Sequence, residues 1–119
     1  MCIRDSDLDP DLAVPDDATA VVTSTATVTG ACTVRFIGFA WNLTHPFASD
    51  IQFSLTSPDG EAPVVIGRPP DKDMVSGSFP LIELFAGEDA VGTWTLSVSD
   101  LGANDEGTLD DWTLNIYCE

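Results

Sequence analysis

Basic side chains are the scarcest feature of this sequence. Among its 119 residues only 4 are Lys or Arg, against 20 Asp or Glu, so the formal net charge at pH 7 is −16. A polyanion of this kind is repelled by phosphate backbones and by anionic lipid surfaces. The composition therefore excludes nucleic acid as an expected partner. It also indicates that bound cations or high salt would lower the self-repulsion of the folded chain.

Long apolar runs are absent too. No stretch approaches the roughly 20 apolar residues that a membrane-spanning helix requires, so we expect no membrane insertion. Hydrophobic residues nevertheless make up 44% of the chain, which is ordinary for a folded protein. A chain of 119 residues is long enough to bury most of its apolar surface in one core. We therefore expect a single, monomeric domain.

The sequence also has little of what catalysis requires. A serine, threonine or cysteine nucleophile needs a neighbouring base, and the only histidine is His45. Neither the Gly-x-Ser-x-Gly elbow nor the His-Glu-x-x-His zinc motif occurs. We therefore assign no catalytic residue and expect that the chain is not an enzyme by itself.

The first six residues, Met1–Ser6, are set aside. Their sequence MCIRDS is the translation of ATG TGT ATA AGA GAC AG, a transposon end that serves as a sequencing adapter, so we interpret them as an adapter-derived artefact. A genuine start is the alternative. Residues 7–13 are acidic and contain Pro10, which predicts a linker. The domain itself is expected over residues 14–119.

Cysteine is sparse, and only Cys32 and Cys118 remain outside the first six residues. The pair lacks Cys-x-x-Cys spacing and, with a single histidine in the chain, makes a poor zinc site. Each cysteine adjoins an apolar, strand-like segment, so we predict a disulfide from an early strand to the last one; two free buried thiols are the alternative. The bridge would contribute roughly 4–5 kcal/mol in the chain-entropy model. It would also indicate an extracellular protein, secreted or at the cell surface.

What the sequence has in abundance is alternation with a period of two. Large apolar residues alternate with Thr, Ser and Asn, a pattern typical of strands with one wet face. The alternating sets are Ile37, Phe39 and Trp41; Ile51, Phe53 and Leu55; Trp94, Leu96 and Val98; and Trp112, Leu114 and Ile116. No stretch keeps the 3.6-residue period of a helix. With turn signals between them, seven or eight short strands predict an all-β fold, an antiparallel β-sandwich or jelly roll.

Two groups of short motifs stand out against this background. The C-terminal group is Gly92–Leu96 (GTWTL), Asp100, Asn104–Leu109 (NDEGTL) and Trp112–Leu114 (WTL). The upstream group is His45–Ile51 (HPFASDI) and Ser57–Gly60 (SPDG). Together they resemble the P domain, or Homo B domain, of kexin- and furin-type proprotein convertases and of secreted bacterial serine proteases. Pro46 stands where that family has Thr, and Asn104 where it usually has Gly. The resemblance covers about Val14–Ile116.

The resemblance implies a galactose-binding-domain-like β-sandwich that does no bond chemistry. In the convertases this domain packs on the subtilisin-like, peptidase S8-like catalytic domain of the same polypeptide, and it supports the folding and regulation of that domain. The alternative is a free-standing carbohydrate- or protein-binding module of a bacterial surface or adhesin protein. A broad apolar patch on one sheet face would favour docking to a catalytic domain. An exposed row of aromatic residues at one loop end would favour the binding module.

The segment Gly92–Glu119 is interpreted as the closing β-hairpin of the sandwich. In a hairpin Trp94 and Trp112 would be neighbours that pack in the core; an exposed sugar-binding platform is the alternative for these two residues. The resemblance further implies that His45 is a structural, hydrogen-bonding residue.

The acidic connection in this predicted hairpin is the candidate metal site. Asp100, Asn104 and Asp105, with Asp110 or Asp111, offer the hard oxygen ligands that calcium prefers, and we expect Asp50 to approach from another loop. The resemblance implies calcium dependence, as in several bacterial members of the family. The competing interpretation is that Asp100 and Asp105 accept hydrogen bonds from backbone N–H groups of the turn.

Overall fold

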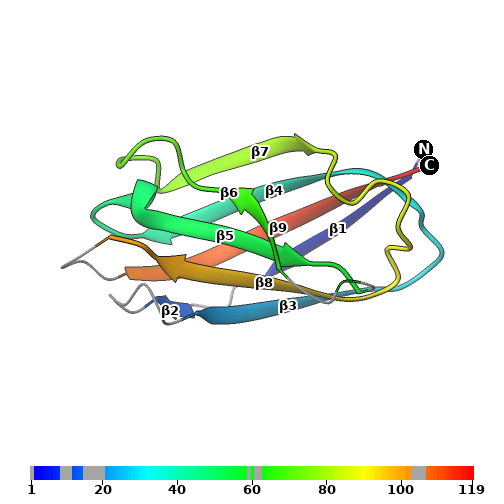
Figure 1. Cartoon of the computed structure of the whole chain (residues 1–119), viewed down its shortest axis with the longest axis horizontal. Coiled ribbons are helices and arrows are strands. Elements are labelled where there is room, and N and C mark those ends of the chain that lie inside the picture. The colour runs from blue at the N-terminus through cyan, green and yellow to red at the C-terminus, as the bar shows by residue number, and fades with distance from the viewer. Residues whose placement is uncertain (1, 9–11, 15–20, 59, 61–62, 103–106) are drawn as a thin grey trace.

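Two antiparallel β-sheets packed face to face make up the molecule (Figure 1). The computed structural model describes residues 2–8, 12–14, 21–58, 60, 63–102 and 107–119. Its strands are β1 (Cys2–Leu8), β2 (Leu12–Val14), β3 (Val22–Val28), β4 (Val34–Thr44), β5 (Ile51–Thr56), β6 (Val64–Gly67), β7 (Ser76–Ile82), β8 (Gly92–Asp100) and β9 (Gly107–Cys118). One sheet has the order β1-β9-β4-β7, with β2 also paired to β9, and the other has the order β3-β8-β5-β6. The predicted all-β antiparallel sandwich is confirmed.

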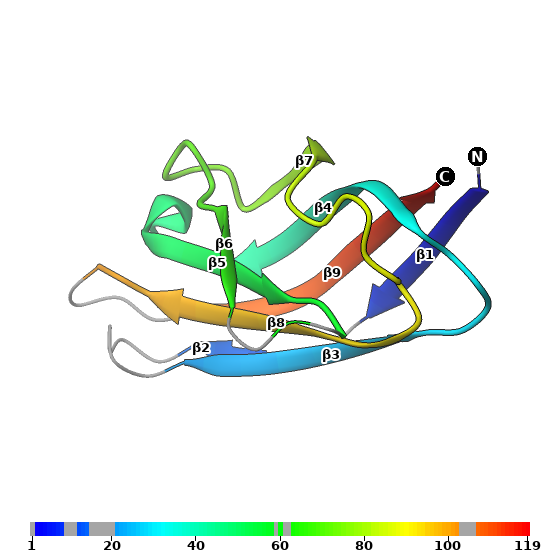
Figure 2. The ribbon, with the colours of Figure 1, turned by 45° about the vertical axis from the view of Figure 1, so that its right-hand side comes forward.

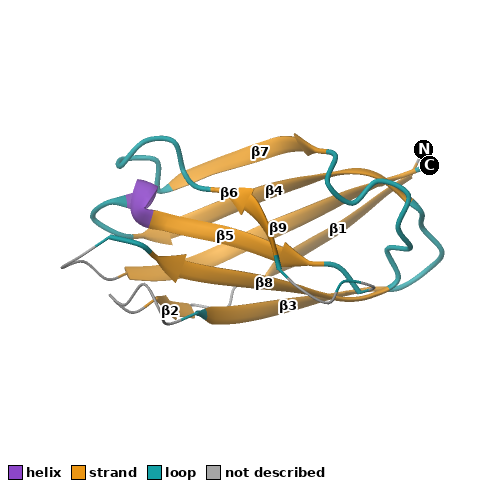
Figure 3. Cartoon of the chain, viewed as in Figure 1, coloured by secondary structure: helices purple, strands orange, loops and turns teal. Residues whose placement is uncertain are grey.

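Strands supply nearly all the regular structure of the described residues, as Figure 3 shows. The one helical element there is the 3-10 turn η1 (Ala48–Asp50), which leads directly into β5. No helix in the described part of the chain is long and apolar enough to span a membrane. This outcome follows from the period-two patterning, which gives each strand one apolar face and leaves no helical stripe to bury.

The core lies between the two sheets and combines aliphatic side chains with aromatic rings from both sheets. Phe39 and Trp41 project from β4 in one sheet, and Phe53 projects from β5 in the other. The ring of Phe53 lies 4.8 Å from that of Phe39 and 5.5 Å from that of Trp41, measured between centroids. Aromatic pairs at such distances stabilise a core by about 0.5–1.5 kcal/mol each beyond the area they bury. The three rings therefore join the sheets at the centre of the molecule.

The last two strands do not form the closing hairpin that we predicted for Gly92–Glu119. β8 pairs with β3 and β5, whereas β9 pairs with β1, β2 and β4, so the two strands belong to different sheets (Figure 2). Each carries a buried tryptophan because each sheet covers the core from its own side. The indole N–H of Trp94 donates to the carbonyl of Ala90, and that of Trp112 donates to Ser24 Oγ, both at 2.9 Å. The core role of both tryptophans is confirmed, and the exposed sugar platform is wrong.

The chain forms strands ahead of Val14, where we expected a linker over residues 7–13. β1 pairs with β9 from Cys2 opposite Cys118 to Leu8 opposite Trp112, and the short β2 pairs with the start of β9. Residues 9–11 lie outside the described part of the chain. The open edge of a sheet accepts any extended segment, so these pairings do not decide which residues are adapter-derived. The division of the chain at residues 6 and 13 stays a prediction.

The predicted disulfide closes one end of the sandwich. Cys32 lies just before β4 and Cys118 is the last residue of β9. The disulfide between them spans a sequence separation of 86 and holds their Cα atoms 5.3 Å apart. Both cysteines are buried. Backbone hydrogen bonds from Ala90 to the Cys32 carbonyl and from Val34 to the Glu88 carbonyl, each 2.8 Å, tie a third segment to the same place. We call this region the disulfide end.

Candidate functional site

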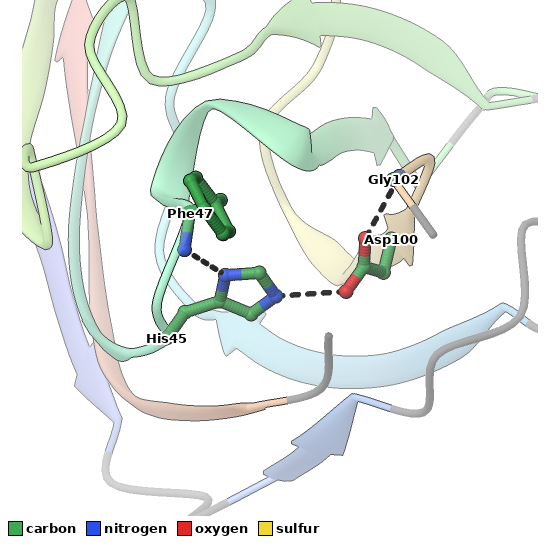
Figure 4. Close-up of polar contacts among 4 residues, drawn as sticks. All are labelled: His45, Phe47, Asp100 and Gly102. Carbon is green, nitrogen blue, oxygen red and sulfur yellow. Dashed lines mark hydrogen bonds and ion pairs between the residues drawn. The ribbon is translucent and has the colours of Figure 1, made fainter. Parts of the chain in front are cut away.

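Asp100 lies at the opposite end of the sandwich, which we call the loop end. It is the last residue of β8 and is fully buried, with 0% of its surface exposed. Its Oδ2 lies 2.7 Å from Nε2 of His45, and its Oδ1 accepts a hydrogen bond of 2.9 Å from the backbone N–H of Gly102 (Figure 4). A buried carboxylate is tolerated only when its oxygens are hydrogen-bonded. These two bonds therefore allow Asp100 to occupy the interior.

The position of the proton on His45 follows from its second contact. The backbone N–H of Phe47 donates to Nδ1 of His45 at 2.9 Å. Since Nδ1 accepts, it carries a lone pair, and the ring hydrogen belongs to Nε2, which donates to Asp100. The contact is thus a charge-assisted hydrogen bond from a neutral imidazole to a carboxylate. Both ring nitrogens are engaged in holding the chain, which is the structural role expected for His45.

Asp50 ends η1 and lies beside the loop that follows β8. Its backbone carbonyl accepts a hydrogen bond of 2.8 Å from the N–H of Leu101, and the next residue, Ile51, stands opposite Asp100 in the β5–β8 ladder. A Cβ atom added to Gly102 would lie 2.0 Å from Oδ2 of Asp50. A side chain at position 102 would therefore displace the carboxylate of Asp50.

Gly102, Gly107 and the backbone N–H of Phe47 complete the site. The sequence motifs did not predict a role for any of the three. A Cβ atom on Gly107 would lie 2.2 Å from the carbonyl oxygen of Thr44 and 3.0 Å from Cβ of His45. Gly107 thus lets the start of β9 approach the end of β4. Gly107 belongs to the NDEGTL motif, but the close approach that requires glycine involves a segment more than 60 residues away. A local pattern carries no signal for such a contact.

The structure places the predicted metal ligands unevenly. Asp50 and Asp100 are brought together beside Gly102, whereas Asn104 and Asp105 lie outside the described residues. Asp110 accepts a hydrogen bond of 2.8 Å from Thr44 Oγ1, and Asp111 accepts one from the amide of Asn42; both are thus bonded across the β4–β9 ladder.

At Asp100 the predicted calcium ligation competes with hydrogen bonding. Among the described residues there is no group of three or more His, Cys, Asp or Glu side chains that could hold a metal ion. Each oxygen of Asp100 already accepts a hydrogen bond. The turn-capping role that we weighed against calcium is confirmed for Asp100 by its bond to Gly102. Calcium binding stays a prediction that depends on Asn104 and Asp105.

Apolar side chains are exposed around this end. Phe47 follows β4, Val75 precedes β7 and Leu101 follows β8, and these residues are 46%, 37% and 39% exposed. We call these three residues the loop-end patch. The strand ends place all three at the loop end, because β4 and β8 finish there while β7 starts there. Other large apolar residues, among them Val65 and Leu84, are exposed away from this end.

Comparison with known sequences gives a family match over most of the chain. The family described as "Proprotein convertase P-domain" matches residues 34–116. That range begins with β4 and ends two residues before the last residue of β9. It includes His45, Asp50, Asp100 and the three residues of the loop-end patch.

Individual proteins align with the chain over a small part of their own length. Human neuroendocrine convertase 2 is 37% identical over 73 residues, which are 57% of this chain and 11% of that protein. The transglutaminase-activating metalloprotease of Streptomyces mobaraensis is 26% identical over 107 residues, which are 87% of this chain and 14% of that protein. This chain therefore spans less than a sixth of either relative.

A solved structure supports the fold independently of sequence. The serine protease of Aeromonas sobria contains a region that superposes on this chain with a TM-score of 0.79 and 17% sequence identity. The superposition covers all of this chain and 28% of that one. At this level of identity the likeness concerns the architecture alone.

Proposed function

Because the chain belongs to the proprotein convertase P-domain family, we propose that it is the accessory domain of a secreted, subtilisin-like serine peptidase. In this role it stabilises or regulates a catalytic domain carried by the same polypeptide and does no bond chemistry itself. The observation that carries the proposal is the family match over residues 34–116. The small share of each relative that the chain covers supports a module that accompanies a larger enzyme.

The absence of a catalytic role is supported by the geometry of His45. Its Nδ1 accepts from Phe47 and its Nε2 donates to Asp100, so neither nitrogen is available to take a proton from a nucleophile. A general base needs a free lone pair within hydrogen-bonding reach of the group it activates. The His45–Asp100 pair therefore joins loops and does not activate a hydroxyl.

We propose that the catalytic domain docks on the loop-end patch. Phe47, Val75 and Leu101 offer exposed apolar surface. The segments that carry Phe47 and Leu101 are joined by the bonds around Asp50 and Asp100, and the carbonyl of Val75 accepts a hydrogen bond from the N–H of Leu43. The backbone N–H of Leu101 donates to the carbonyl of Asp50, and the N–H of Asp50 donates to the carbonyl of Phe47. These two bonds hold Leu101 and Phe47 in a fixed relation. A rigid apolar surface loses little conformational freedom when a partner covers it.

A secreted location is part of the same proposal. The disulfide between Cys32 and Cys118 is typical of proteins that mature in an oxidising compartment. Calcium is proposed as the ion that offsets the repulsion between carboxylates at the loop end, with Asp50, Asp100, Asn104 and Asp105 as its oxygen donors.

The experiment that tests the proposal uses the complete parent protein. The reading frame on the N-terminal side should encode a peptidase domain with the Asp, His and Ser of a subtilisin; the Streptomyces relative makes a metalloprotease domain the competing expectation. Deleting residues 14–119 should lower the yield of active enzyme severalfold, since the catalytic domain loses a stabilising contact. Replacing Phe47 and Leu101 by Ser should reproduce part of that loss, with Val64→Ser, at an exposed site on β6, as the control. An unchanged yield after deletion would overturn the accessory role.

A further inference from the structure

The two sheets have four edges. In one sheet β1 and the short β2, which both pair with β9, form one edge and β7 forms the other; β3 and β6 form the edges of the second sheet. An edge strand has backbone N–H and C=O groups that no neighbouring strand satisfies, so it is a place where another extended chain can add itself. Natural proteins block such edges with proline, with charged side chains or by keeping the strand short. The four edges of this protein differ in how well they are blocked.

Three of the edges carry a recognisable block. β7 contains Pro80, which has no N–H to offer. β6 is four residues long and is bounded by Pro63 on one side and by Arg68 and Pro69 on the other. The edge formed by β1 and β2 carries Asp7, which lies outside the six residues interpreted as adapter-derived, and β2 is only three residues long. Strand addition is therefore disfavoured at β1, β6 and β7.

β3 has none of these blocks. Its sequence VTSTATV contains no charged residue, no proline and no glycine, and five of its seven residues are β-branched. It pairs with β8 at all seven positions without a bulge, from Val22 opposite Val98 to Val28 opposite Gly92. Along its other edge it has no strand partner among the described residues. β3 lies along the lower margin of the molecule in Figures 1 and 2.

The strand is also held firmly in its register. Ala26 and Val28 point inward and are 3% and 4% exposed. Ser24, the inward residue before them, accepts a hydrogen bond from the indole of Trp112 in the opposite sheet. β3 is therefore fixed to both sheets, and an added strand would meet an edge whose backbone groups are already aligned.

We propose that the free edge of β3 binds an extended segment of another polypeptide as an added strand, and that this segment is rich in β-branched residues and carries net positive charge. The outward-facing Thr23, Thr25 and Thr27 are exposed and suit cross-strand pairing with β-branched or hydroxyl side chains. The charge of the partner follows from the net charge of −16, which attracts a basic segment and repels a second copy of this chain. The β3 edge is formed by residues other than those of the loop-end patch, so the two surfaces can be tested separately.

A synthetic peptide, Lys-Thr-Val-Thr-Val-Thr-Val-Lys, tests the proposal with the intact chain. It should bind, and amide hydrogen exchange at alternate residues of β3 should slow about tenfold or more once the peptide bonds to them. The matched control is the same peptide with alternate backbone nitrogens methylated, which keeps the side chains and charge but removes the ladder donors. Its affinity should fall about tenfold or more. Equal binding of both peptides, no binding, or protection at β6 or β7 in place of β3 would overturn the proposal.

Two lysine variants separate edge pairing from simple charge attraction. Thr25→Lys places a charge on the edge strand, whereas Thr93→Lys places the same charge on β8, an interior strand, at another exposed position of the same face. Thr25→Lys should weaken peptide binding severalfold more than Thr93→Lys, because a lysine on an edge opposes strand addition. Equal effects would show that net charge alone attracts the peptide and would overturn the edge site. Sedimentation should show the free chain as a monomer; a dimer whose β3 amides are protected would overturn the proposed partner.

Discussion

At one end of the sandwich a disulfide closes the chain, whereas at the other end a buried carboxylate joins the loops through hydrogen bonds. Cys32 and Cys118 make a covalent link between segments 86 positions apart. Asp100 links the β4–β5 connection to the loop after β8 through His45 and Gly102. The disulfide end is held by a covalent bond together with backbone hydrogen bonds, while the loop end is built from polar contacts that a ligand or partner can modify. Stability and responsiveness are thus divided between opposite ends of one small domain.

Removal of the disulfide should have the largest effect on this comparison. Cys32→Ala with Cys118→Ala should lower the free energy of unfolding by about 4–5 kcal/mol, since a loop of 86 residues is no longer closed in the unfolded chain. Urea unfolding measures the loss. Both proteins should carry Cys2→Ala, so that the third thiol cannot exchange with the bridge. A loss below about 1 kcal/mol would show that the disulfide end does not depend on its covalent link.

Truncation of the buried carboxylate should come next. Asp100→Ala removes the acceptor of the Nε2–H of His45, which is buried, and of the N–H of Gly102, which is partly buried; the two losses should cost about 3 kcal/mol together. Asp89→Ala is the matched control, because Asp89 accepts from the N–H of Val91 in the same turn geometry at an exposed site. That control should lose about 1 kcal/mol or less. Equal losses would mean that burial of Asp100 is not what makes it important.

A smaller effect should follow from crowding the loop after β8. Gly102→Ala places a methyl group against the carboxylate of Asp50 and should destabilise the fold by about 1–3 kcal/mol. Asp50→Ala in the same chain removes the atoms that the methyl group meets. The double variant should therefore be less destabilised than the sum of the two single variants. Strict additivity in a double-mutant cycle would contradict the contact.

Calcium should give the smallest change, and it sharpens the comparison because it should act on the loop end alone. At a concentration tenfold above its dissociation constant, calcium should add about 1.4 kcal/mol, which raises Tm by about 5 °C. The measurement is a thermal scan of chelator-treated protein with and without added calcium. Magnesium at the same concentration is the control for general screening of the negative charge. An identical Tm in chelator and in calcium would remove calcium from the proposal.

The fold was largely predictable because its signal is local. Alternation in sets such as Phe39 and Trp41 specifies strands residue by residue, and an all-β sandwich follows from many such strands. The pairing of the last two strands was not predictable in the same way. A buried tryptophan at position 94 or 112 requires an inner face, yet it does not say which sheet provides that face. Adjacency in sequence favoured a hairpin, and tertiary packing placed β8 and β9 in different sheets.

Less of the candidate site than of the fold was predictable from the sequence. The acidic residues could be read as a cluster, and His45 as a structural residue, from the motifs alone. The bond between His45 and Asp100 joins positions 55 apart, and the close contact at Gly102 involves Asp50, which lies on a different connection. Such contacts depend on how the sheets are stacked. They become visible only when the strands are assembled.

The disulfide also determines how the domain would respond to mechanical force. A pull applied between the two termini passes through the bond from Cys32 to Cys118 and bypasses the residues between them. Only the segments outside that loop can lengthen while the bond is intact. Reduction would release 86 residues, or about 290 Å of additional contour length at the usual extension per residue. A tether containing this module would therefore be short under oxidising conditions and long under reducing ones.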